Sequence, residues 1–91
     1  MSDEDIQPGE KYVLLTEEGC SGCHQVKKAL SRELSSGEID EMPIETEEGK
    51  HLDDEFKPRY VPFCLIRSTD GRYRPCKEGT VDDLIDKALE K

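Results

Sequence analysis

The chain has 91 residues, which is the length of one small domain. Its formal net charge of −9, from 22 acidic and 13 basic residues, disfavours binding to a phosphate backbone or to an anionic membrane surface. No apolar stretch reaches the ~18 residues that a membrane-spanning helix needs, and the acidic start Met1–Asp5 is unlike a secretory leader. We therefore expect a monomeric, cytoplasmic protein that binds neither nucleic acid nor membrane.

The first half of the chain predicts a strand followed by a helix. Residues 1–10 are polar and predict a flexible acidic tail, after which a single domain occupies residues 11–91. Residues 11–16 form a short apolar run, which is typical of a buried strand. Between residues 20 and 35, apolar residues recur at spacings of three and four, which predicts a helix, and Gly37 is suited to cap it.

The second half predicts the rest of a mixed sheet. Residues 42–46 indicate a weak strand and residues 47–57 a short helix. Two further strands, at 61–67 and 72–76, are joined by a turn, and a last helix begins at Thr80. The order β-α-β-α-β-β-α predicts an α/β fold with one mixed four-stranded sheet and helices on both faces.

The turn between the last two strands fixes a strand register. Ser68–Gly71 is typical of a type I turn with a left-handed glycine, which gives a three-residue loop, Thr69–Gly71. Paired residues then have numbers that sum to 140, so Cys64 faces Cys76. In a reducing cytosol we expect these two to be neighbouring free thiols.

Cys20 and Cys23 form a C-x-x-C motif between the first predicted strand and helix. A cysteine at a helix N-terminus faces unpaired backbone N–H groups and the positive end of the helix dipole, both of which stabilise a thiolate. The second cysteine, three residues later, can attack a mixed disulfide formed by the first. We therefore expect a redox-active pair in which Cys20 is the catalytic nucleophile and Cys23 the resolving residue.

The chain resembles the thioredoxin superfamily, and within it the glutaredoxins, over residues 11–91. The resemblance rests on the C-x-x-C motif, on Val61-Pro62 at the head of a later strand, and on segments 27–30 and 79–84. It implies a thioredoxin-like fold and a thiol–disulfide oxidoreductase that reduces or exchanges protein disulfides. It also implies that the Val61–Pro62 bond is cis and lies beside the motif, and that the Val61 backbone contacts the substrate.

The resemblance further bears on the electron donor. Arg59, with Thr80 and Asp82 at the start of the last helix, matches positions that bind glutathione in glutaredoxins. Glu17 and Glu18, however, replace the usual basic residue before the motif, which disfavours an anionic tripeptide. No tightly bound cofactor is implied, and the reducing equivalents would come from glutathione or from a thioredoxin-reductase-like donor.

Three alternatives remain open from the residues alone. Cys20 to His24 matches the C-x-x-C-H haem-attachment pattern, although no leader for export is visible. Four cysteines could hold zinc, although Cys64 and Cys76 do not have the spacing of a zinc knuckle, and we predict no metal. The chain could also be a non-catalytic binding module that keeps the fold.

Overall fold

The computed structural model describes residues 6–90, and its centre is a single four-stranded sheet. In spatial order the strands are β2 (Ile39–Pro43), β1 (Lys11–Thr16), β3 (Phe63–Arg67) and β4 (Tyr73–Pro75). β1 runs parallel to β2 and antiparallel to β3, which in turn is antiparallel to β4. The predicted α/β fold with a mixed four-stranded sheet is therefore confirmed.

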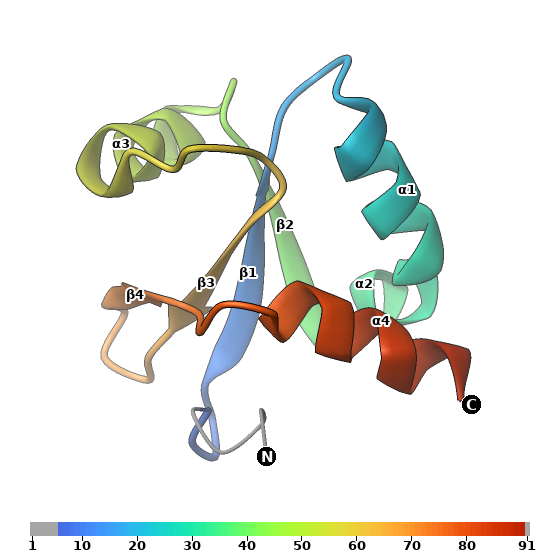
Figure 1. Cartoon of the computed structure of the whole chain (residues 1–91). Helices are drawn as coiled ribbons and strands as arrows, with labels where there is room; N and C mark the ends of the chain where they lie inside the picture. The colour runs from blue at the N-terminus through green and yellow to red at the C-terminus, as the bar shows by residue number, and fades with distance from the viewer. Residues whose placement is uncertain (1–5, 91) are drawn as a thin grey trace.

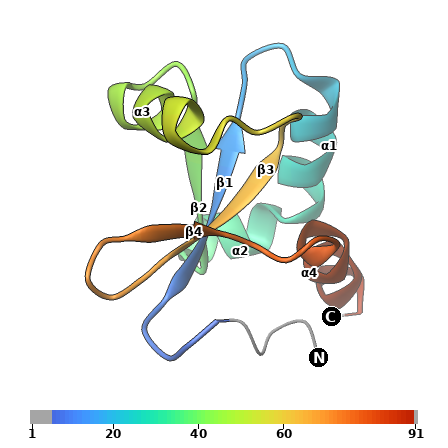
Figure 2. The same cartoon turned by 60° about the vertical axis from the view of Figure 1, so that its left-hand side comes forward.

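Helices cover both faces of this sheet, as Figures 1 and 2 show. The four helices are α1 (Ser21–Ala29), α2 (Ser31–Ser36), α3 (Glu47–Phe56) and α4 (Thr80–Leu89). α1 and α4 pack on one face and α3 packs on the other. No helix within residues 6–90 has the length and hydropathy needed to cross a membrane.

β1 is the central strand, and its burial explains its continuous apolar sequence. Tyr12 and Leu14 point into the core beneath α1 and α4, whereas Val13 and Leu15 point into the core beneath α3. A strand covered on both faces has no solvent side on which polar residues would alternate. Leu30, which is fully buried, joins the α1 and α4 side of the core.

Two predicted element boundaries are wrong. The helix expected over residues 20–35 is divided at Leu30, whose φ of −105° and ψ of 21° separate α1 from α2. The second strand occupies Ile39–Pro43, not 42–46, because Thr46 caps α3: its hydroxyl accepts the Gly49 N–H at 3.0 Å. Gly37 does adopt the predicted left-handed cap, with φ of 86°.

The third and fourth strands are also shorter than predicted. β3 begins at Phe63, where its pairing with Leu15 of β1 starts, two residues later than expected. The hairpin register is confirmed, since Ile66 pairs with Arg74 and Ser68 N–H donates to Arg72 O at 2.7 Å. The loop glycine, Gly71, has the left-handed φ of 89° that such a turn requires.

Cys64 and Cys76 face each other as the register predicts, but they are not free thiols. They form a disulfide, with Cα atoms 5.4 Å apart. Cys76 N–H also donates to Cys64 O at 3.1 Å, so the two residues form a hydrogen-bonded cross-strand pair. Their Cα separation is the usual value for such a pair and falls within the range for disulfides. The expectation of free thiols is corrected accordingly.

The segment before β1 contacts the domain. Ile6 packs against the core beneath α4, and Glu10 holds Arg74 through two hydrogen bonds of 2.7 and 2.9 Å. Arg74 lowers the pKa of the Glu10 carboxyl to about 2. The contacts of the domain thus begin before Lys11, while Met1–Asp5 of the expected tail lie outside the described residues.

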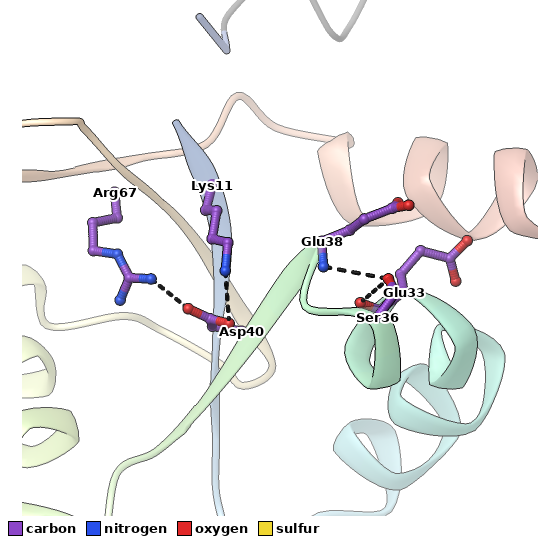
Figure 3. Close-up of polar contacts among 6 residues, drawn as sticks. All are labelled: Lys11, Glu33, Ser36, Glu38, Asp40 and Arg67. Carbon is purple, nitrogen blue, oxygen red and sulfur yellow. Dashed lines mark hydrogen bonds and ion pairs between the residues drawn. The ribbon is translucent and has the colours of Figure 1, made fainter. Parts of the chain in front are cut away.

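Ion pairs connect the three longer strands at the end of the sheet far from the β1–α1 loop. Figure 3 shows Asp40 of β2 between Lys11 of β1, at 3.5 Å, and Arg67 of β3. The same view shows the end of α2, where Ser36 Oγ donates to Glu33 O and accepts the Glu38 N–H. The Ser36 hydrogen bonds lie at the α2–β2 connection, after which β2 pairs with β1.

Candidate active site

Cys20 is the N-cap residue of α1, at the carboxyl end of β1. Its extended backbone (φ −82°, ψ 114°) places the side chain over the first turn, where Cys20 Sγ accepts the Cys23 N–H at 3.0 Å. Cys20 is partly exposed, and its own N–H donates to Glu17 O at 3.2 Å. A sulfur at this position receives a backbone N–H together with the positive end of the helix dipole, and both favour the thiolate.

Cys23 occupies a different environment one helical turn later. It is only 1% exposed, and burial together with the nearby Cys20 raises the pKa of its thiol to about 11, burial being the larger cause. The positive charge of Lys27 lowers that pKa in part. Lys27 Nζ lies 3.1 Å from Glu41 Oε2, and this carboxylate oxygen also accepts a hydrogen bond from the Thr16 hydroxyl at 2.8 Å. The two cysteines therefore differ in exposure, and the pKa of the buried one is raised.

Val61 and Pro62 lie against the motif, as the sequence predicted. The peptide bond between them is cis, and the Cys20 thiol lies 3.7 Å from Val61 O. The backbone at Gly22 is also close to this segment, since a Cβ there would lie 3.8 Å from Pro62 Cδ. The loop before β3 and the start of α1 therefore form one surface around the Cys20 sulfur.

A groove of about 580 Å³ continues from this surface between α1 and α4. Its walls are mainly apolar, with Val26 and Ala29 from α1 and Ile85 from α4, and it also contains Pro62. Of the residues predicted to bind substrate, Pro62, Thr80 and Asp82 line this groove; the Thr80 hydroxyl donates to Lys77 O at 2.7 Å and so stabilises the turn before α4.

Arg59, by contrast, is exposed and is not among the groove-lining residues. The structure does not bring it together with Thr80 and Asp82. Lys77 and Tyr60 are among the groove-lining residues that the sequence did not lead us to expect. Tyr60 is 66% exposed and packs edge-on against Phe63, with ring centroids 6.4 Å apart. Its place directly before Val61 was the signal available in the sequence.

Acidic groups surround the loop that leads to Cys20. Glu17 and Glu18 are both exposed there. Glu45, which the sequence reasoning did not connect to the site, accepts the Glu18 N–H at 3.0 Å through its carboxylate. Three acidic residues thus belong to the loop before Cys20 or contact its backbone.

The cysteine arrangement bears on the zinc alternative. A four-cysteine site needs four thiolates, whereas Cys64 and Cys76 are joined to each other. Across the described part of the chain, no group of three or more His, Cys, Asp or Glu side chains is placed to hold a metal ion.

Comparisons with known proteins bear on the fold. No protein-family model matches the chain, and no curated protein matches it. Among solved structures it is similar to a J-Trx1 fragment of ERdj5, with a TM-score of 0.59 and 15% identity over 97% of this chain. The chain spans 46% of that fragment's length.

Two bacterial structures give the same result. A thioredoxin from Thermus thermophilus has a TM-score of 0.55 and 17% identity, covering 89% of this chain and 72% of that one. The oxidised C-terminal domain of DsbD from Neisseria meningitidis has a TM-score of 0.57 and 13% identity, covering 97% of this chain and 84% of that domain. These likenesses, together with the strand order and the helix that begins at the cysteine motif, show that the chain has the thioredoxin fold.

Proposed function

We propose that the domain is a thiol–disulfide oxidoreductase that acts on protein disulfides, with Cys20 as nucleophile and Cys23 as resolving thiol. The observation that carries this proposal is the asymmetry of the pair. Cys20 is partly exposed and accepts a backbone N–H at a helix N-terminus, whereas Cys23 is buried and its pKa is raised to about 11.

In the first step, the Cys20 thiolate attacks one sulfur of the substrate disulfide. The substrate's S–S bond breaks, its other sulfur leaves as a thiolate, and a mixed disulfide with Cys20 forms. The Cys23 N–H, at 3.0 Å, stabilises the thiolate before attack. The substrate chain would lie along Val61 and Pro62, whose backbone borders the Cys20 sulfur.

In the second step, Cys23 loses its proton and attacks Cys20 Sγ. The mixed disulfide breaks, the second substrate thiolate leaves, and the domain keeps a Cys20–Cys23 disulfide, so two electrons have passed to the substrate. The raised pKa keeps Cys23 protonated until the mixed disulfide has formed, and Lys27 helps to stabilise the thiolate when the proton leaves. A donor dithiol or two glutathione molecules would then return the two electrons.

The charges near Cys20 support a protein partner with a basic patch over glutathione. Glu17, Glu18 and Glu45 lie beside the loop before Cys20, and glutathione itself carries carboxylates. Arg59, the cation expected to bind one of them, lies outside the groove lining. The glutaredoxin likeness therefore stays a prediction, and a thioredoxin-reductase-like system is the donor that we propose.

The catalytic proposal is tested by turnover of one protein disulfide substrate with each of two donor systems. One contains glutathione with its reductase, and the other contains a thioredoxin reductase. We expect Cys20→Ser to abolish reduction and Cys23→Ser to accumulate a mixed disulfide that mass spectrometry detects. Ser35→Ala, an exposed change on α2, is the control. A Cys20→Ser protein as active as the wild type would overturn the proposal and favour a non-catalytic binding module.

The electrostatic part is tested by reversing the two exposed acids. Glu17→Lys with Glu18→Lys should raise the glutathione-dependent rate and flatten its rise with ionic strength, because exposed charges are screened beyond about 10 Å at 0.1 M salt. Asp86→Lys with Glu90→Lys changes the net charge equally at the far end of α4 and is the matched control. Equal effects of the two pairs would show that only net charge matters, against a local acidic barrier.

A further inference from the structure

The Cys64–Cys76 disulfide lies in the wall of the groove that begins beside the C-x-x-C motif. Both cysteines line this groove, as do Gly22 of the motif and Pro62. The disulfide is therefore part of the groove surface and does not lie at the far end of the hairpin. It lies on the surface that, in the proposed function, receives the substrate.

The two cysteines differ in exposure. Cys64 is 6% exposed and belongs to the core beneath α1 and α4, whereas Cys76 is partly exposed at the edge of that core. Disulfide exchange begins with attack on one sulfur, and access decides which one. Because Cys76 is the more exposed residue of the two, we expect a thiolate entering the groove to attack its sulfur.

The disulfide also joins β3 to the segment that leads into α4. After Cys76 only Lys77, Glu78 and Gly79 precede the helix, and both the N–H and the hydroxyl of Thr80 donate to Lys77 O. α4 in turn supplies groove-lining residues, among them Val81 and Ile85. Only three residues thus separate Cys76 from the helix that forms one groove wall.

The strand pairing next to this connection is short. β4 has three residues, and its last residue is Pro75, which has no N–H to donate. Beyond Pro75 the remaining backbone bond to β3 is Cys76 N–H to Cys64 O. The disulfide accordingly adds a covalent cross-link, besides the polypeptide chain itself, between β3 and the segment that leads into α4.

We propose that Cys64–Cys76 is a second redox centre, reduced by a dithiol that enters the groove, and that its redox state controls substrate binding there. One thiolate of the dithiol attacks Cys76 Sγ, the Cys64–Cys76 bond breaks, and Cys64 leaves with the electron pair and takes up a proton. The second thiol of the dithiol then attacks the mixed disulfide and releases Cys76. The dithiol is oxidised to its disulfide, and the domain gains two electrons and two protons.

The redox part is tested in a chain without the first pair, Cys20→Ser with Cys23→Ser, so its outcome does not depend on the proposed catalysis. The protein is equilibrated with mixtures of reduced and oxidised dithiothreitol, quenched in acid and alkylated, and its free thiols are counted by mass spectrometry. We expect two thiols to appear together while circular dichroism still shows the folded domain. If they appear only when the domain unfolds, the disulfide is purely structural and the proposal is wrong.

The binding part rests on the proposed function, because it uses substrate turnover. Cys64→Ala with Cys76→Ala keeps both sites apolar and imitates the reduced state. We expect a several-fold change in KM with little change in kcat, since the Cys20 and Cys23 chemistry is untouched. An unchanged KM in a folded variant would contradict control of binding. If this variant fails to fold, the dithiothreitol titration will show thiols and unfolding together, which likewise overturns the proposal.

Discussion

Cys23 should be almost unreactive at neutral pH, and the structure gives the size of the effect. Its pKa is raised from 9.0 to about 11, with burial as the largest cause. Two pKa units correspond to about a hundredfold less thiolate at a given pH, or about 3 kcal/mol. At pH 7 roughly one Cys23 side chain in ten thousand would be ionised.

The rate of alkylation by iodoacetamide measures the reactivity of each thiol directly in two single variants. In Cys23→Ser, Cys20 should react readily at pH 7. In Cys20→Ser, Cys23 should react much more slowly, with a rate that rises about tenfold per pH unit. Removing Cys20 also removes part of the cause, so the pKa of Cys23 in this variant should lie between 9.0 and about 11. Equal rates at pH 7, or a faster Cys23, would refute the assignment of roles.

The same shift predicts a loss of stability in alkali. A thiol whose pKa is higher in the folded state favours folding as long as it stays protonated. That contribution is complete below pH 9.0 and is lost as the pH rises towards about 11. Chemical denaturation of the reduced wild type should therefore show a steeper decline over this window than Cys23→Ser does.

Three further changes test the packing, a cap and an ion pair. Leu30→Ala should lower the free energy of unfolding by about 2–5 kcal/mol in urea denaturation, because it leaves a cavity at a fully buried site. Thr46→Ala should cost about 1 kcal/mol through loss of the α3 cap, whereas the exposed Thr69→Ala should cost little. Arg74 lowers the pKa of Glu10 to about 2, so the ionised Glu10 contributes stability that is complete above pH 4.5 and is lost as the pH falls to about 2. Glu10→Gln should remove this part of the acid-dependent loss of stability. Thermal melting at a series of pH values would test this, and an unchanged acid profile would contradict it.

The sequence predicted most of the sheet because its strands carry strong local signals. The buried run of β1 and the turn at Ser68–Gly71 were sufficient to place the central strand and the hairpin register. β2 was misplaced because its position depends on the parallel pairing with β1, which is not local. Thr46 misled the prediction further, because a β-branched residue suits a strand as well as a helix cap.

At the site, the motif and its helix were predictable, whereas the surroundings were not. Cys20 at a helix start follows from its place after β1. The approach of Glu45 to Glu18 joins segments 27 residues apart, and the groove needs α1 and α4 side by side. The Cys64–Cys76 pairing was predicted in register, but its oxidation was not, because we expected a reducing compartment and because directly opposed Cβ atoms usually lie slightly too far apart for a disulfide.

The short edge strand β4 has a consequence for self-association. On the β4 side of the hairpin, Arg72 O accepts the Ser68 N–H and Cys76 N–H donates to Cys64 O, so Arg72 and Cys76 point to β3. Because hydrogen-bonding directions alternate along an antiparallel strand, Tyr73 and Pro75 face outward. Pro75 has no hydrogen to offer, which leaves Tyr73 as the one outward N–H donor in this strand. A β-strand from another molecule could therefore form few backbone hydrogen bonds with this edge of the sheet. The outer edge of β4 is thus protected against strand-by-strand aggregation, and concentrated solutions of the domain should not form fibrils by that route.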